Sequence, residues 1–505
     1  MAAASRAAHH GSRRLSPCQP VGRRAQVPRP TTRPLPKGPA MYLKLALGNV
    51  RRSLKDYSVF FATLAFAACL LYSFSASGDY LAAMALTERQ RATLGSQQLN
   101  TVMSAFSVFV VIVFAFLVSY GFRFILRRRK REFALYAILG MDGPHVSRIL
   151  RYEGFLVGAA SFAAGVAAGV VFSPYFMLLE AYVFGVAWAP ALVFSTGSFL
   201  WTLGCFAALV AVACVSSGRV VSRSTPAALF SADRRPERLL GEGRPWAQRL
   251  QLVGGAVLVA AVWATVLLQP GMFLAMLLPF GLVALAGTYL LFRSLAHCVP
   301  AWLRRHPRRY LSGLTCFTVR QVEAKASSSA MAMAMVCVLL ACGVCMVVAG
   351  LAFSVGIRDG VAPGAGISDP FTWAPIGFIG LFYGIAFLLS AMAVLALQQL
   401  SEAADSAIRY RVLADLGADD AMMGRSLRSQ LAVYFGVPLA GALLHDAVGL
   451  TLIALLAMGV GAGGFGAMAG ATVAGVVVFM ALYYAVTYAE CRRILFAGRA
   501  ARREV

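Results

Sequence analysis

Hydrophobic positions along the chain gather into ten runs. Each is long enough to cross a bilayer as one α-helix, because about 20 apolar residues span the hydrocarbon core. Between the fifth and sixth runs, Gln269-Pro270-Gly271 forms a tight turn, so these two runs form a hairpin. The pattern predicts an all-α integral membrane protein with ten transmembrane helices, at residues 57–77, 101–126, 154–178, 192–217, 251–269, 271–292, 328–355, 373–398, 431–457 and 467–488.

Basic residues predict which ends of these helices face the cytoplasm. The chain has 46 Lys and Arg against 21 Asp and Glu, a net charge of +25, although only 13% of its residues are charged. With the N-terminus inside, 43 of the 46 fall in the inner segments, as the positive-inside rule requires. We therefore expect an N-in, C-in protein whose charge faces the inner surface of the lipid bilayer, and no nucleic-acid partner.

Residues 1–40 differ from the rest because they are rich in Arg, Pro, Ser and Ala. They lack the apolar core of a signal peptide, and we expect them to be disordered. A second hypothesis is that translation starts at Met41. From there an amphipathic helix, with Leu43 and Leu47 on its apolar side, is predicted to lie in the inner headgroup layer before the first span.

Two stretches of the chain are similar in sequence. Residues 49–52 (N-V-R-R) precede the first span as 318–321 (T-V-R-Q) precede the seventh, and the Leu-Gly turn of 137–142 after the second span returns in 413–419 after the eighth. Both copies start inside, which predicts a parallel internal repeat and a 4+2+4 plan. The predicted domains are a basic extension (1–40), a first four-helix module (41–230), a two-helix hairpin (231–300) and a second four-helix module (301–505).

Candidate chemistry within the spans is sparse. The sequence has no Walker-type phosphate-binding motif, so we expect no ATPase, no bound cofactor and no metal site in this chain. Cys342 and Cys345 form a C-x-x-C in mid-membrane, which we interpret as helix packing. Two small-residue motifs, 165–169 and 466–470 (both G-x-x-x-G), predict close helix contacts.

Three ionisable residues fall within or near apolar runs. His445 and Asp446 are adjacent, and charge inside a bilayer is costly and often functional. One interpretation is a gate or polar substrate contact between the two halves. The other is a histidine–aspartate hydrogen bond that closes the bundle. Glu180 lies near the outer end of the third span, where we expect it to be solvated.

The segment that follows the second span carries a recognisable sequence. Residues 130–141 read K-R-E-F-A-L-Y-A-I-L-G-M and resemble the matching segment of the FtsX-like permease family. In the second half, 402–417 and 430–445 resemble the bacitracin-export (Bce) type of this family, and 224–229 resembles its short Pro-containing segment. The resemblance extends over about residues 42–495.

This resemblance implies the permease subunit of an ATP-binding-cassette transporter in the bacterial plasma membrane. Its partner would be an ATPase, expected as a dimer that uses ATP and Mg²⁺, and a sensor histidine kinase is a further candidate partner. The substrate would be amphipathic, either an antimicrobial peptide or a lipid-like molecule. One departure matters: the stretch 356–371 is too short for the large extracellular domain of Bce-type permeases, which puts peptide recognition in doubt.

The cytoplasmic segments after the second and eighth spans are interpreted as coupling elements, which transmit the movement of the ATPase to the spans. Charged residues would pair with the ATPase surface and apolar ones would dock in its groove. The alternative is that these helices lie on lipid without a partner. The candidate residues are Arg131, Glu132, Leu135, Tyr136, Leu139 and Gly140 in the first copy, and Arg409, Tyr410, Leu413, Leu416 and Gly417 in the second.

Two other functions remain open at this point. One is a subunit that senses envelope stress and signals without transport, which the missing external domain favours. The other is an ion-coupled secondary transporter, which normally needs ion-coordinating carboxylates at broken helices in mid-membrane. Apart from Asp446, the predicted spans lack such carboxylates.

Overall fold

In the computed structural model, the regular secondary structure of the described residues is entirely helical. The described residues are 39–84 except 53, the separate positions 88, 111, 114, 115, 118, 119, 121, 122, 125 and 126, and then 129–223, 245–356 except 325, and 373–503 except 460. Contacts group Tyr42–Val505 into one compact unit and Met1–Met41 into another. The predicted extension 1–40 lies almost wholly outside the described residues.

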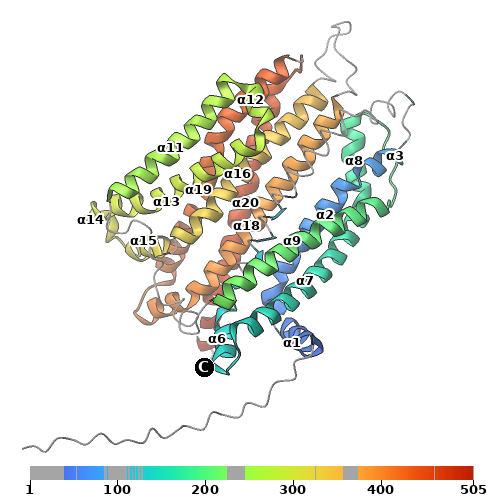
Figure 1. Ribbon diagram of the computed structural model, residues 1–505. Helices are drawn as coiled ribbons and strands as arrows, with labels where there is room; N and C mark the ends of the chain where they lie inside the picture. Colours follow the sequence, from blue (N-terminus) through green and yellow to red (C-terminus); the bar gives the residue numbers. More distant parts are fainter. Residues whose placement is uncertain are drawn as a thin grey trace, which may run out of the picture. The chain divides into compact units, whose positions relative to one another are not determined.

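The first part of the larger unit contains α1 (Pro39–Arg52), α2 (Leu54–Ser75), α3 (Ser77–Ala82), α6 (Lys130–Ile138), α7 (Gly143–Val171), α8 (Ser173–Phe184) and α9 (Thr196–Arg223). The long helix α7 packs along α2 on one side and α9 on another (Figure 1). Small residues allow this, because a Cβ on Gly165 would lie 2.3 Å from the carbonyl oxygen of Ala65 in α2. The close contact predicted at 165–169 is therefore confirmed.

The predicted hairpin is formed by α11 (Pro245–Leu268), α12 (Pro270–Ala275) and α13 (Leu277–Arg304), with its turn at Gln269. Two short helices follow, α14 (Pro307–Tyr310) and α15 (Thr315–Ala324). α11 and α13 pack along each other, and they reach the last part of the chain through α16 and α19. The hairpin thus associates with the second module.

The second module consists of α16 (Ala326–Leu351), its π-helical continuation η1 (Ala352–Gly356), α18 (Ala374–Asp415), α19 (Asp420–Gly459) and α20 (Phe465–Arg503). α16 packs along both α18 and α19. A Cβ on Gly380 would lie 2.7 Å from the Cα of Gly350, so the backbones of α16 and α18 touch. The motif at 466–470 makes no such contact, since nothing lies within 4 Å of a Cβ on either glycine; that prediction was wrong.

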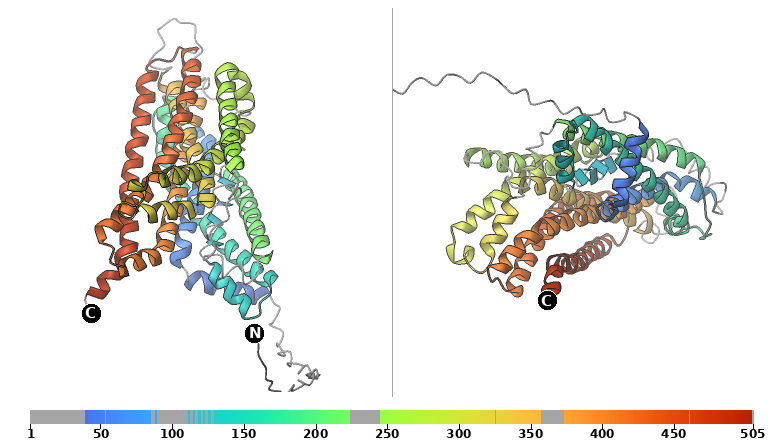
Figure 2. Two further views of the ribbon diagram at one scale, coloured as in Figure 1. Left: turned by 90° about the vertical axis from the view of Figure 1, so that its left-hand side faces the viewer. Right: turned by 90° about the horizontal axis from the view of Figure 1, so that it is seen from below.

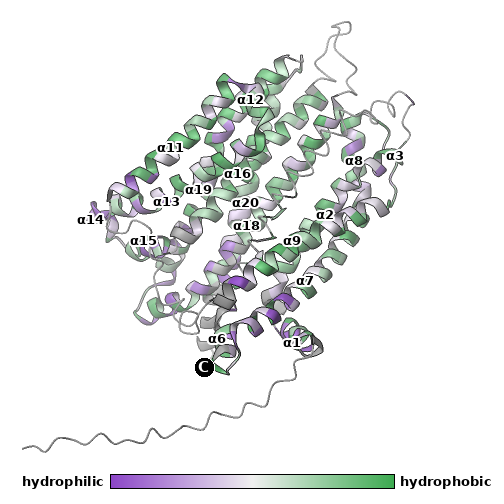
Figure 3. Cartoon of the chain, viewed as in Figure 1, coloured by the Kyte–Doolittle hydropathy of each residue, from purple (hydrophilic) through white to green (hydrophobic). Residues whose placement is uncertain are grey.

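Eight of the described helices are long and apolar enough to cross a membrane, and they correspond to the third to tenth predicted spans. The first span corresponds to α2, whose apolar stretch Phe60–Ser75 is shorter, and the second lies mostly outside the described residues. Figure 3 shows these helices as mainly hydrophobic, with polar residues gathered near α1, α6, α14 and α15. A multi-pass all-α membrane protein is confirmed, while ten spans, the 4+2+4 plan and the orientation stay predictions.

Glu180 is the main correction to the predicted exposure of charged groups. Its side chain is fully buried, and neither carboxylate oxygen has a hydrogen-bond partner among the described residues. The prediction of a solvated carboxylate was wrong because α8 packs against α3 and α18, which cover it. On α8, Phe176 and Phe184 flank Glu180 at helical spacing and contact Phe382 and Phe378 of α18.

Candidate functional site

Two turns of the same construction follow α6 and α18. In the first, Gly140 has φ +88°, and the amide of Met141 donates to the carbonyl of Tyr136 at 3.0 Å. In the second, Gly417 has φ +90°, and the amide of Ala418 donates to the carbonyl of Leu413 at 2.9 Å. Both are Schellman-type helix ends, which need a left-handed residue directly after the helix. The two segments that resemble each other in sequence thus end in turns of the same backbone geometry, which supports the predicted repeat; we call them the coupling turns.

Each coupling turn presents a leucine to its surroundings. Leu139 is 73% exposed and Leu416 is 78% exposed, each directly before its glycine. One helical turn earlier, Leu135 and Val412 are also exposed. Both turns lie toward the lower end of the unit in Figures 1 and 2. Two matching apolar surfaces, one from each half, are thus left uncovered within the described part of this chain.

The glycines of the coupling turns give a first testable prediction. Replacing Gly140 or Gly417 by Ala places a Cβ at positive φ, which costs about 1–2 kcal/mol each. We expect a lower midpoint of thermal unfolding in detergent for either variant. Gly436→Ala is the matched control, because this helical glycine also has open space around it, and there Ala is expected to stabilise slightly. A midpoint for Gly140→Ala as high as that of this control would contradict the assigned geometry.

A buried charged cluster lies behind the first coupling turn. Arg129, one residue before α6, forms an ion pair with Glu153 of α7, and their side chains are only 1% and 0% exposed. Tyr57 of α2 donates to Glu153 at 3.0 Å, and Asn49 of α1 donates to it at 2.7 Å. Arg129 also pairs with Glu132 at 2.6 Å. The charged cluster joins α1, α2, α6 and α7 at one point.

The environment of Arg129 favours its charged form. Burial lowers the pKa of the guanidinium, but Glu153, Tyr57 and Glu132 together outweigh this effect, so the pKa of Arg129 lies above its usual value. A buried ion pair of this kind holds its partners in place, because removal of one member leaves an uncompensated charge. The charged cluster therefore holds α1, α2, α6 and α7 in fixed positions relative to one another.

A neutral cluster occupies the corresponding place in the second half. Ser426 of α19 hydrogen-bonds Thr318 of α15 at 2.7 Å and Tyr410 of α18 at 3.1 Å, and Gln430 donates to Tyr410 at 2.9 Å. Gln430 and Glu153 lie equally far beyond their turn glycines in the sequence. The two halves thus use one architecture with different chemistry: an ion pair in the first and uncharged hydrogen bonds in the second.

The other predicted coupling residues have different surroundings. Tyr136 and Leu413 are partly buried at their turns, and the side chain of Arg131 lies outside the described residues. Glu132 is engaged by Arg129, while Arg409 bonds Ser406 at 2.9 Å and pairs with Glu402 at 3.6 Å.

Docking of Tyr410 in a partner groove was wrongly predicted. Its side chain is 3% exposed and lies in the neutral cluster, where burial raises the pKa of its phenol. Of the apolar candidates, Leu135, Leu139 and Leu416 remain accessible.

His445 and Asp446 point to different neighbours. The indole of Trp263 in α11 donates to Nδ1 of His445 at 3.1 Å, so the Nε2–H faces Thr288 of α13 at 3.0 Å. Asp446 instead accepts from the thiol of Cys345 in α16 at 3.5 Å. The predicted bond between them is not formed, because successive helix residues point about 100° apart. His445 fixes the hairpin to α19, and neither residue lies between the two four-helix modules.

The C-x-x-C segment packs as predicted. Cys345 lies over Gly449 of α19, where an added Cβ would come within 2.6 Å of its sulfur, and Cys337 lies over Gly441 in the same way at 2.8 Å. Cysteines of α16 thus fill the spaces that glycines leave on α19. No group of three or more His, Cys, Asp and Glu suited to a metal ion occurs among the residues that the structure describes.

Sequence reasoning missed Arg129 and Glu153, which carry the charged cluster. Arg129 stands in a run of five basic residues, 127–131, that the positive-inside rule already explains. The available signal was Glu153, an acidic residue directly before the predicted third span that needs a nearby cation if it is buried.

Comparison with known proteins finds similarity to membrane permeases over part of the chain. A model described as FtsX-like permease C-terminal matches residues 104–226, which include α6, the first coupling turn and α7 to α9. Among relatives from Bacillus subtilis, the uncharacterized ABC transporter permease YvcS is 23% identical over 39% of this chain, and the ABC transporter permease protein YxdM is 27% identical over 28%. The bacitracin export permease protein BceB is 22% identical over 53%.

These alignments are partial on both sides. They cover 29% of YvcS, 22% of YxdM and 42% of BceB. The chain thus spans less than half the length of these relatives. The similarity supports a shared membrane module. It does not extend over the whole length of these relatives.

Proposed function

We propose that this chain is the membrane subunit of an ATP-driven transporter in the bacterial plasma membrane, because residues 104–226 match the FtsX-like permease family and parts of the chain are similar to ABC transporter permeases. The ATPase would be a separate chain that binds ATP and Mg²⁺. The substrate would be an amphipathic molecule, either an antimicrobial peptide or a lipid-like compound. A sensor histidine kinase is a further proposed partner.

The duplicated coupling turn is the observation that carries this proposal. An ATPase dimer offers two equivalent surfaces, and this chain offers two equivalent turns, each with an exposed leucine before a left-handed glycine. Leu139 and Leu416 would each dock on one ATPase subunit. An apolar side chain that enters a partner pocket is a common source of binding energy.

The buried clusters supply the mechanical link from these turns to the spans. Movement of the first turn displaces α6, and Arg129 transfers that displacement to Glu153 on α7 and to Tyr57 on α2. In the second half, α18 is continuous from the coupling turn into the membrane, and Tyr410 ties it to α15 and α19 through Ser426. Closure of an ATPase dimer would thus move both helix groups.

The proposal is tested with the purified chain in nanodiscs and a stand-alone ABC ATPase from the same genome. We expect a stable complex of one chain with two ATPase subunits, and ATP hydrolysis that rises on complex formation and is inhibited by vanadate. Bacitracin, named for one relative, is the first substrate probe. If no ABC ATPase of that genome binds, the proposal is refuted. A complex that hydrolyses ATP but moves neither peptide nor lipid would instead favour the signalling function.

A further inference from the structure

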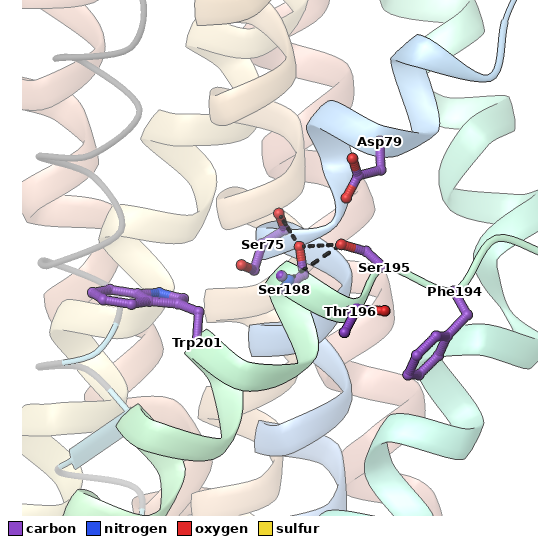
Figure 4. A pocket seen from close by; sticks show the side chains of 8 residues that line it. Ser75, Asp79, Phe194, Ser195, Thr196, Ser198 and Trp201 are labelled. Carbon is purple, nitrogen blue, oxygen red and sulfur yellow. Dashed lines mark hydrogen bonds between the residues drawn. The ribbon is translucent and has the colours of Figure 1, made fainter.

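A polar pocket of about 600 Å³ lies where the end of α2 meets the start of α9 (Figure 4). It belongs to the first module and is distinct from the coupling turns and the buried clusters. Its lining consists of four hydroxyl-bearing residues, one carboxylate, one glycine and two aromatic residues: Ser75, Asp79, Phe194, Ser195, Thr196, Gly197, Ser198 and Trp201.

Hydrogen bonds hold the two sides of this pocket together. Ser198 donates to the carbonyl of Ser75 at 2.8 Å and lies 2.9 Å from the hydroxyl of Ser195. The amide of Ser195 in turn donates to the hydroxyl of Tyr72 at 3.1 Å. These bonds connect α2 to the first turn of α9, so the pocket is preformed rather than assembled by a ligand.

The pocket lies at the end of the module opposite to the charged cluster. Ser75 follows Tyr57 by 18 residues on α2, which places them about 27 Å apart along the helix. Near the other end of α9, a Cβ on Gly218 would meet Ser147 at the start of α7, so the first turn of α9 faces away from the coupling turns. On the predicted orientation, the pocket opens at the outer surface.

The charge of the lining selects the kind of ligand. Asp79 contributes a carboxylate at the pocket wall, and none of the eight lining residues is basic. Phe194 and Trp201, each 56% exposed, flank the opening and offer aromatic surface. A pocket lined by one carboxylate and by aromatic rings is a suitable environment for an ammonium group that carries an apolar tail.

We propose that this pocket binds the ammonium group of an amphipathic cation at the outer membrane surface, with Asp79 as its counter-charge and Trp201 along its apolar part. The inference rests on the proposed function for its meaning, because it names the substrate chemistry of that transporter. Two sources supply this chemistry, a cationic amphipathic substrate and the ammonium headgroup of a neighbouring lipid.

Equilibrium binding to the full chain in phosphatidylglycerol nanodiscs tests the proposal without any ATPase. The probe is dodecyltrimethylammonium labelled with bromine on its chain, which quenches tryptophan fluorescence. We expect saturable quenching that is largely lost in Trp201→Phe, and an affinity roughly tenfold lower in Asp79→Asn but retained in Asp79→Glu. The matched control is Glu490→Gln, which removes a half-exposed carboxylate near the C-terminal end of α20 and should leave binding unchanged.

Other outcomes would overturn the assignment. Equal probe affinity for Asp79→Asn and the native chain would refute the proposed site. A loss of affinity in Glu490→Gln as large as that in Asp79→Asn would refute it as well. If Asp79→Asn lowers the thermal midpoint without changing binding, the carboxylate has only a structural role and the proposal is refuted. Nanodiscs of phosphatidylethanolamine distinguish the sources, because weaker probe binding there in the native chain but not in Asp79→Asn identifies the lipid headgroup as occupant. ATPase binding is measured separately, so failure of this pocket and failure of the transporter proposal are distinguishable.

Discussion

Replacing Glu153 by Gln is expected to lower the free energy of unfolding by about 3–5 kcal/mol, because it leaves the buried guanidinium of Arg129 without its counter-charge. The remaining partners are Tyr57 and the half-exposed Glu132, which cannot replace a buried carboxylate. The measurement is the thermal unfolding midpoint in detergent, together with the yield of monodisperse protein. We expect a marked loss in both.

The repeat provides the matched control for this experiment. Gln430→Leu removes one hydrogen-bonding side chain from the neutral cluster at the corresponding position, and we expect a smaller loss of about 1–3 kcal/mol. The double variant Arg129→Met with Glu153→Leu removes both charges and should be more stable than Glu153→Gln alone. If the double variant were the least stable of the three, the ion pair would not explain the effect.

The second large effect is expected at the coupling turns. Aspartate at Leu139 or Leu416 places a charge where an apolar contact is proposed, and each change should weaken ATPase binding by at least roughly tenfold. The two sites belong to different halves and share no described contact, so their effects should add to about 100-fold or more in the double variant. The assay is titration of nanodisc-embedded protein with the ATPase.

Leu311→Asp is the control for this series. Leu311 is 70% exposed, lies between α14 and α15, and is outside both coupling turns. It should leave ATPase binding unchanged, since the introduced charge is the same but the position differs. Equal weakening by all three single variants would indicate a general charge effect and would contradict docking at the turns.

Much of the fold follows from the sequence because membrane spans are set by length and hydrophobicity. Eight predicted spans correspond to described helices. The coupling turns were also predictable, since Gly140 and Gly417 end helices at matching places in the repeat and glycine alone adopts positive φ readily. Exposed Leu139 and Leu416 follow from the same alignment.

The buried polar groups were less accessible to sequence reasoning. Nothing in the basic run 127–131 distinguishes the inward-facing Arg129 from its neighbours, because that choice depends on how α6 meets α7. Glu180 was assigned to solvent from its place near a span end, whereas packing of α8 on α18 buries it. Tyr410 was predicted to be a coupling residue that contacts the ATPase, although its helical phase points it toward Ser426 of α19.

The difference between the two clusters restricts how the halves can be recombined. A chimera in which α19 replaces α7 alone would place Gln430 opposite Arg129. The buried guanidinium of Arg129 would then lack its counter-charge. Grafts that carry α1, α2, α6 and α7 together would keep every charge with its partner. The segments that can be exchanged between the two halves of this chain are therefore whole groups of helices that share a buried polar cluster, and not single helices, although the two turns have the same geometry.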